Sequence, residues 1–185
     1  MIKSKKELKE YLKFERQLYI DGGKIAEIKM KLIHDSDYLI WHYIKMLRFT
    51  EYYYNKDNKI LYWLYERKKN MEGSKLGISI FQNSVGKGLK IYHYGNIVIN
   101  SNAKVGENIK LHGDNCIGNK GEQDKHNAPI VEKNVELGFG AQIIGDIHIG
   151  SETIIASNAV VVKNSLEKGI VLAGIPAKKI KKIGE

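Results

Sequence analysis

The chain has 185 residues, with 30 Lys and Arg against 21 Asp and Glu, and therefore a formal net charge of +9. This length suits one domain with a small addition, and no apolar run reaches the roughly 20 residues that a membrane span needs. The single cysteine, Cys116, excludes an intrachain disulfide framework and favours a reducing, cytoplasmic location. The N-terminus, from Met1 to Glu15, is charged throughout and predicts no secretory signal. We expect the lysines to form mainly a solvated surface, because no nucleic-acid-binding motif accompanies them.

Composition divides the chain near residue 72. Nine of the 11 tyrosines and both tryptophans precede this point, whereas 16 of the 18 glycines follow it. Two such different compositions imply two kinds of packing. We therefore predict an α-helical N-terminal region over residues 1–73 and a β domain over residues 74–185.

Three segments of the N-terminal region have apolar residues at helical spacing. They are residues 8–12, residues 40–47 and residues 60–65. A loop is expected at residues 21–23, and Asp35 or Ser36 is expected to cap the second helix. We interpret these apolar stripes as core-forming surfaces.

The second region contains a repeat with a six-residue period. Three series of aliphatic residues have this period: Val85, Ile91 and Ile97; then Ile99, Val105, Leu111 and Ile117; then Val131, Leu137, Ile143, Ile149, Ile155 and Val161. Such a period fits neither an amphipathic helix nor a run of hairpins. It predicts short strands joined by turns, which wind into a β-solenoid with three faces and with the aliphatic residues pointing inward.

The repeat is interrupted at two places. Its phase slips by two residues between Ile97 and Ile99, and residues 119–129 carry no repeat. A polar insertion of this length in a regular solenoid is predicted to form an excursion loop, and such loops often carry function.

The repeat and the closing segment Ala173–Lys178 together resemble the hexapeptide-repeat acyltransferases. The resemblance is greatest to the serine acetyltransferase group and its relatives in polysaccharide biosynthesis, and it depends on Gly86–His93, Ile97–Asn100, Val105–Asn108 and Asp124–His126. It implies a left-handed parallel β-helix, a homotrimer, acetyl-CoA as co-substrate and no metal. It also implies direct transfer of the acetyl group to a hydroxyl, without a covalent enzyme intermediate.

His93 is the predicted general base. A neutral alcohol attacks a thioester poorly, and an imidazole that titrates near neutral pH is suited to remove its proton. His93 lies two residues after the inward Ile91 and matches the catalytic histidine of the resembled family. The residues predicted to bind the acceptor are Tyr92, His112, Lys125 and His126.

The resemblance further implies that the pantetheine arm of acetyl-CoA lies in a groove between two subunits, kept open by small residues and flanked by lysines. The predicted set is Gly138, Gly140, Ala141, Ala156, Ser157, Ala173, Lys178 and Lys179. The alternative is that some of the small residues serve only the corners of the solenoid. Cys116 is interpreted as a small core or corner residue and not as a nucleophile.

Two departures from the serine enzymes affect the predicted acceptor. Those enzymes have an aspartate where this chain has Tyr92 and an arginine where it has Lys125, and the aspartate that orients their histidine falls near Ile78. Without a carboxylate to recognise its ammonium group, serine is expected to bind poorly. The sequence therefore favours a sugar hydroxyl, in a surface polysaccharide or its precursor.

Three alternatives to the sugar acetyltransferase remain open. The first is a serine O-acetyltransferase of cysteine biosynthesis. The second, from another class, is a non-catalytic basic solenoid that binds an anionic polymer. The third is a metal-dependent hydratase, which is disfavoured because His93, His112 and His126 lack the short ligand spacing of zinc motifs.

Overall fold

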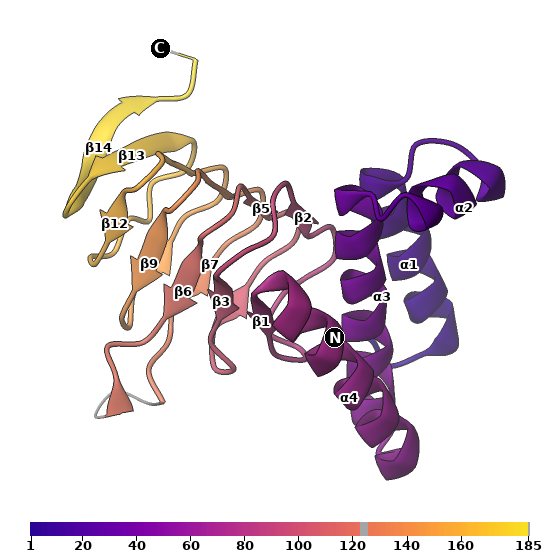
Figure 1. Ribbon diagram of the computed structural model, residues 1–185. Helices are drawn as coiled ribbons and strands as arrows, with labels where there is room; N and C mark the ends of the chain where they lie inside the picture. The colour runs from indigo at the N-terminus through magenta and orange to yellow at the C-terminus, as the bar shows by residue number, and fades with distance from the viewer. Residues whose placement is uncertain (123–125, 185) are drawn as a thin grey trace.

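The computed structural model describes residues 1–122 and 126–184 (Figure 1). Four helices come first: α1 (Lys5–Tyr19), α2 (Lys24–Leu32), α3 (Ser36–Asn55) and α4 (Lys59–Leu76). The described strands follow: β1 (Ile78–Ile80), β2 (Lys90–Ile91), β3 (Ile97–Ile99), β4 (Lys104–Val105), β5 (Lys110–Leu111), β6 (Cys116–Gly118), β7 (Ile130–Val131), β8 (Glu136–Leu137), β9 (Gln142–Ile144), β10 (His148–Ile149), β11 (Ile154–Ile155), β12 (Val160–Val161), β13 (Ile170–Gly174) and β14 (Ala177–Lys182). None of the described helices has the length and apolar character that crossing a membrane requires.

The helices begin at side chains that satisfy free backbone N–H groups. Ser4 and Glu7 form a capping box at the start of α1, and the Asp35 carboxylate accepts from the N–H groups of Asp37 and Tyr38 at the start of α3. The predicted cap at Asp35 is therefore confirmed. The additional helix α2 was not expected from the sequence, and it has no buried residue.

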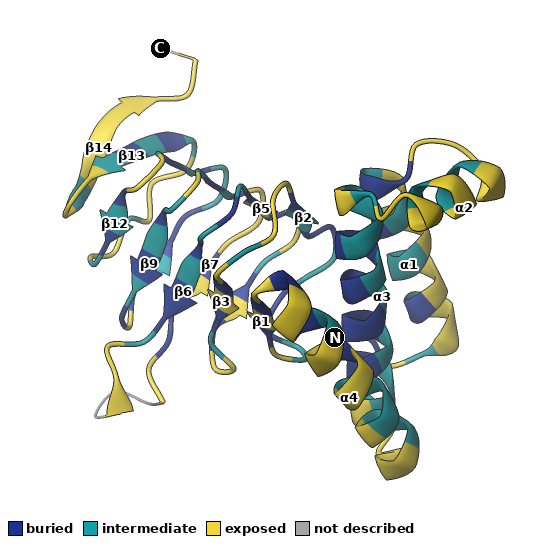
Figure 2. Ribbon diagram, viewed as in Figure 1, coloured by how far each residue is buried: buried dark blue, intermediate teal, exposed yellow. Residues whose placement is uncertain are grey.

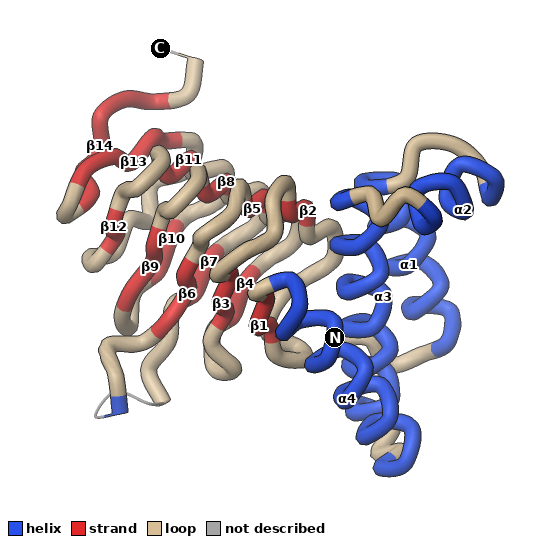
Figure 3. The backbone as a smooth tube through the Cα atoms, in the orientation of Figure 1, coloured by secondary structure: helices blue, strands red, loops and turns tan. Residues whose placement is uncertain are grey.

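The strands form three sheets that the chain visits in rotation (Figure 3). Sheet A has the order β1-β3-β6-β9-β12, sheet B has β4-β7-β10, and sheet C has β2-β5-β8-β11-β13-β14. All strand pairs are parallel except β13 with β14. Helices followed by short parallel strands were predicted, and this part of the fold is confirmed.

The pairing register explains both interruptions of the repeat. Leu137 pairs with Ile155, and the interval between these positions is three hexapeptides. The interval from Ile91 to its partner Leu111 is longer by two positions, because both Ile97 and Ile99 are buried in β3. The interval from Leu111 to its partner Leu137 is longer still, because the insertion at positions 119–129 lies between them.

Inward aliphatic side chains fill the space between the sheets. In Figure 2 the strands of the coil carry buried positions along their length. In sheet C, Ile91, Leu111, Leu137 and Ile155 follow one another through the paired strands, and each is fully buried. The second inward position of the repeat is buried as well, at Leu89, Ile109, Val135, Ala141, Ile147 and Ala159. Each coil therefore covers the apolar surface of the next, which is the main source of stability in such a stack.

A buried ionic cluster joins the helices to the first coil. The Arg48 guanidinium on α3 contacts the carboxylates of Glu15 at 2.7 Å and Glu51 at 2.9 Å. It also donates to the carbonyl oxygens of Val85 at 3.0 Å and Gly86 at 2.6 Å. Burial alone would lower the pKa of Arg48, but the two carboxylates outweigh it and raise that pKa.

Two buried tyrosines hold the first strands against the helices. The Tyr19 hydroxyl accepts from the N–H of Ile91 and donates to the carbonyl of Leu89, each at 2.8 Å. The Tyr43 hydroxyl accepts from the N–H of Ile80 at 3.1 Å. Polar groups at the exposed end of the sheets are thereby satisfied, and the helices cover edges that would otherwise be free to pair.

We predict that Arg48→Ala lowers the free energy of unfolding by about 3–5 kcal/mol, because it leaves two buried carboxylates without their cation. Urea unfolding at neutral pH measures this loss. The control is Arg16→Ala, which removes a partly exposed pair with Glu27 and is expected to cost less than about 1 kcal/mol. Equal losses for the two variants would contradict the assigned role of the cluster.

Candidate functional site

His93 lies in the turn that connects β2 in sheet C to β3 in sheet A. It is exposed, whereas Ile91, two residues earlier, is fully buried. The coils stack closely at this corner: a Cβ added at Gly113 would lie 3.3 Å from the carbonyl oxygen of His93 and 3.1 Å from the Phe139 ring. Gly113 also has a φ of +119°, so both space and backbone conformation favour glycine there. The backbone of His93 is thus closely packed at an outer edge of the coil, and the residue is open to solvent.

Tyr92, His112 and Glu136 form a contiguous polar group beside His93. The rings of Tyr92 and His112 stack, with centroids 4.5 Å apart and an angle of 27° between planes. His112 Nε2 lies 2.8 Å from Glu136 Oε1, and Lys110 Nζ lies 3.1 Å from Glu136 Oε2. Pairing of β2 with β5, and of β5 with β8, brings these side chains together although Glu136 follows His112 by 24 residues.

The Glu136 carboxyl group is ionised in this arrangement. Partial burial raises its pKa, but hydrogen bonds from His112 and Lys110 and the charge of Lys110 outweigh burial, so the pKa of Glu136 is below its usual value. In contrast, no carboxylate among the described residues hydrogen-bonds to the His93 ring. Ile78, where the resembled family has its orienting aspartate, is a buried residue of β1.

The loop that follows β6 leaves a different edge of the coil. It connects β6 in sheet A to β7 in sheet B, whereas His93 lies between sheets C and A. His126 is exposed in this loop, which projects away from the sheets (Figure 3). Lys125, predicted to bind the acceptor, lies outside the described residues. Within one chain, Tyr92 and His112 therefore stack next to the turn that carries His93, whereas His126 lies on another edge.

The small residues predicted to bind acetyl-CoA lie mostly along the edge that carries His93. Gly138 and Gly140 follow β8, and Ala156 and Ser157 follow β11, so both pairs are at the corner between sheets C and A. The prediction is wrong for Ala141, because its side chain is fully buried inside the coil and cannot line an outer groove.

The two glycines of this set also have structural reasons to be glycine. A Cβ at Gly138 would lie 2.6 Å from the backbone N of Ser157, and one at Gly140, whose φ is +72°, would collide with the Asn158 side chain. Close stacking of successive coils accounts for both. Of the two lysines, Lys179 is paired with Glu167 at 2.7 Å, whereas Lys178 is exposed.

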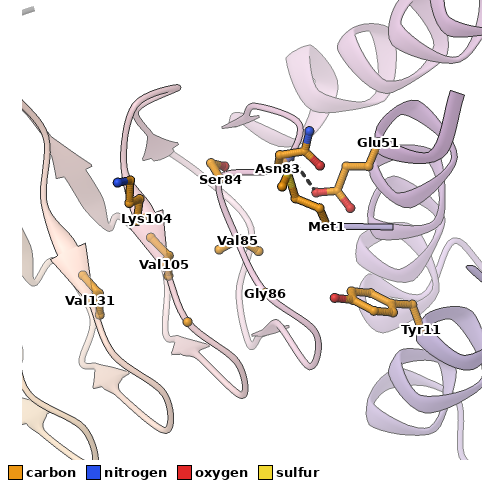
Figure 4. Close-up of a pocket in the computed structure, with 11 residues that line it drawn as sticks. Met1, Tyr11, Glu51, Asn83, Ser84, Val85, Gly86, Lys104, Val105 and Val131 are labelled. Atoms are coloured by element: carbon orange, nitrogen blue, oxygen red, sulfur yellow. Dashed lines mark hydrogen bonds between the residues drawn. The ribbon is translucent and has the colours of Figure 1, made fainter. Parts of the chain in front are cut away.

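A cavity of about 270 Å³ lies where the helices meet the first coils (Figure 4). Its lining residues are Met1, Tyr11, Glu51, Asn83, Ser84, Val85, Gly86, Lys104, Val105, Gly106 and Val131. Glu51, the carboxylate in this cavity, already accepts from the N–H of Asn83 and from Arg48. His93 does not line the cavity, which we interpret as a feature of helix docking. Among the described residues, no three His, Cys, Asp or Glu side chains are arranged to hold a metal ion.

The curated relatives and the solved structures that are similar to this chain include the same kind of protein. No protein-family model matches the chain. A serine acetyltransferase of Buchnera aphidicola (subsp. Schizaphis graminum) is 33% identical over 101 residues, which covers 54% of this chain and 38% of the relative. One from Buchnera aphidicola (subsp. Acyrthosiphon pisum) is 26% identical over 173 residues, covering 86% of this chain and 61% of the relative. The chain therefore spans less than two thirds of the length of these relatives.

Solved structures of serine acetyltransferases share the fold. The enzyme from Brucella abortus in complex with coenzyme A has a TM-score of 0.76 and 25% identity, over 97% of this chain and 70% of that one. The soybean enzyme complexed with serine has a TM-score of 0.75 at 17% identity, over 94% of this chain and 69% of that one. The resemblance to serine acetyltransferases with the hexapeptide-repeat fold is thereby confirmed.

These comparisons correct the predicted acceptor. The sequence favoured a sugar hydroxyl because it has no aspartate at position 92, but the curated relatives are serine acetyltransferases. That prediction rested on Tyr92, Lys125 and Ile78, the positions where the resembled family has its serine-binding and orienting residues. The structure places the Glu136 carboxylate on the same face as Tyr92, from a strand two coils away. No sequence signal pointed to Glu136, because the insertion at residues 119–129 hides its register with His112.

We predict that Cys116 reacts more slowly with iodoacetamide at mildly alkaline pH in the folded protein than in concentrated urea. Burial raises the pKa of this half-buried thiol, so less of the reactive thiolate is present at a given pH. Mass spectrometry of the time course measures the two rates. Faster alkylation of the folded protein would instead identify Cys116 as an activated thiol.

Proposed function

We propose that this chain is an acetyl-CoA-dependent serine O-acetyltransferase in which His93 is the general base. The similarity to serine acetyltransferases, which extends over 86% of the chain, carries this proposal. It is supported by the exposed position of His93 at an edge lined by small residues. A histidine inside the coil would have been unable to meet a substrate.

The proposed reaction follows from these groups. His93 accepts the proton of the serine hydroxyl as its oxygen forms a bond to the thioester carbonyl carbon. The carbon–sulfur bond of the tetrahedral intermediate then breaks, and the proton passes from His93 to the leaving thiolate. The products are O-acetylserine and coenzyme A. Because the serine hydroxyl attacks the thioester directly, no covalent enzyme intermediate is formed in this proposal.

Acetyl-CoA is proposed to bind along the edge between sheets C and A. Ala156 and Ser157 lie on this edge with little side-chain bulk, and exposed Lys178 is available to a phosphate group. Lys179 is able to contribute only by exchanging its pair with Glu167, an exchange that costs little at an exposed site.

We further propose that the coil is a left-handed β-helix and that three chains assemble side by side. Rotation of the chain through three parallel sheets supports the coil. The separation of His93 and His126 on two different edges supports assembly, because the loop of one chain is then able to reach the His93 edge of its neighbour. The extents of the two regions, 1–73 and 74–185, stay predictions.

We predict that His93→Ala lowers kcat by about a hundred- to ten-thousand-fold, the usual contribution of a general base. Release of coenzyme A from acetyl-CoA in the presence of serine measures this. The control is His148→Ala, since His148 lies on sheet B and bonds Glu132 there. Unchanged activity of the His93→Ala variant would show that His93 is not the general base. Absence of serine-dependent coenzyme A release by the unaltered protein would refute the proposed function.

We predict that the assembled protein has a mass close to three times the 21.1 kDa of one chain, measured by light scattering. We expect His126→Ala to have low activity as well, because His126 is predicted to bind the acceptor. Mixing His93→Ala chains with His126→Ala chains should then restore activity, because some sites combine His93 and His126 from different chains. Each shared site needs intact His93 from one chain and intact His126 from its neighbour. When the two variants are mixed in equal amounts at random in a closed ring, about a quarter of the sites meet this condition. A monomeric mass, or no recovery after remixing, would contradict a shared site.

A further inference from the structure

Glu136 is the single acidic residue in the described strands of this protein. Each of the other acidic residues in the described part of the chain belongs to a helix, a turn or a loop. The strand faces are otherwise apolar, neutral or basic. A carboxylate placed at this position is therefore a distinctive feature of sheet C.

The contacts of Glu136 orient the imidazole of His112. Nε2 of His112 lies 2.8 Å from the ionised Glu136 carboxylate, so in the neutral imidazole the favoured tautomer has its proton on Nε2, which donates to that carboxylate. Nδ1 is then an acceptor, and no described residue donates to it. About one third of each of these two side chains is exposed. The pair therefore presents a carboxylate and a nitrogen lone pair to the same region of solvent.

This region adjoins the proposed base. Tyr92, next to His93 in the chain, stacks on His112, and His112 contacts Glu136. The three side chains come from the paired regions of β2, β5 and β8, whose strands are spaced about 4.8 Å apart. Two such spacings come to about 10 Å, a separation that serine covers only with a hydrogen bond at each of its ends.

We propose that Glu136 and His112 form the subsite that binds the protonated amino group of the acceptor. This inference rests on the proposed transfer of acetyl to serine, whose ammonium group needs a negative, hydrogen-bond-accepting partner. The ammonium takes the place of Lys110 on Glu136, and this exchange is inexpensive because the lysine side chain is half exposed. The other nearby cation, Lys90, is held by Asp37 and by the carbonyl of Leu18.

The test is steady-state kinetics of Glu136→Gln, which keeps the shape of the side chain and removes its charge. The KM for serine should rise about 10- to 100-fold, the scale of one hydrogen bond between charged groups. The kcat and the KM for acetyl-CoA should change little. The preference for serine over 3-hydroxypropanoate, which lacks the amino group, should fall by the same factor. Glu136→Asp should restore part of the serine affinity.

The matched control is Glu132→Gln. Glu132 makes the same kind of contact, 3.0 Å to Nε2 of His148, but on sheet B, and its loss should leave both KM values unchanged. An unchanged serine KM in Glu136→Gln, or a fall in kcat alone, would overturn the subsite while leaving the proposed function intact. If the unaltered protein does not acetylate serine, the function fails and the subsite fails with it.

Discussion

The stacking of inward aliphatic side chains on one another is the constraint from which the other features of this structure follow. Ile91, Leu111, Leu137 and Ile155 stay in contact only if the chain returns to the same face after each coil. That requirement fixes which residues face outward and which fall at corners. Tyr92, the residue after Ile91, faces outward, and His93 follows it at the corner. The buried aliphatic side chains thus determine where the site residues lie, although they take no part in the proposed reaction.

A stack of coils leaves its first coil uncovered, and the helices solve this problem. The Tyr19 hydroxyl bonds the carbonyl of Leu89 and the N–H of Ile91 along one edge of β2, the strand that precedes His93. Arg48 bonds the carbonyl groups of Val85 and Gly86, a few residues earlier. The same helices therefore stabilise the end of the stack and fix the strand that bears the proposed base. Buried ionic groups of this kind often add little net stability, but loss of one partner leaves a buried charge uncompensated, so the helices and the first coil are held in the arrangement that keeps Arg48 paired.

Much of the fold was predictable from residues close together in the sequence. The six-residue period indicated the strands, the slip at Ile97–Ile99 was visible, and Asp35 was a recognisable cap. Features that depend on distant residues were not predictable. Arg48 meets Glu15 from 33 residues away, and His112 meets Glu136 across an insertion that breaks the period. The sugar acceptor was wrongly favoured because local position does not show which groups meet on the outer face. Ala141 was wrongly placed in a groove although the six-residue period already puts it at an inward position, where it is buried.

The central claim is that a serine hydroxyl and a thioester meet at His93, on the edge between sheets C and A. A crystal structure of the protein with coenzyme A and serine tests it most directly. The account predicts that the serine hydroxyl lies about 3 Å from a ring nitrogen of His93, with the thiol of coenzyme A beside it. Serine and coenzyme A bound elsewhere, for example in the cavity lined by Tyr11 and Glu51 with His93 left in solvent, would contradict it.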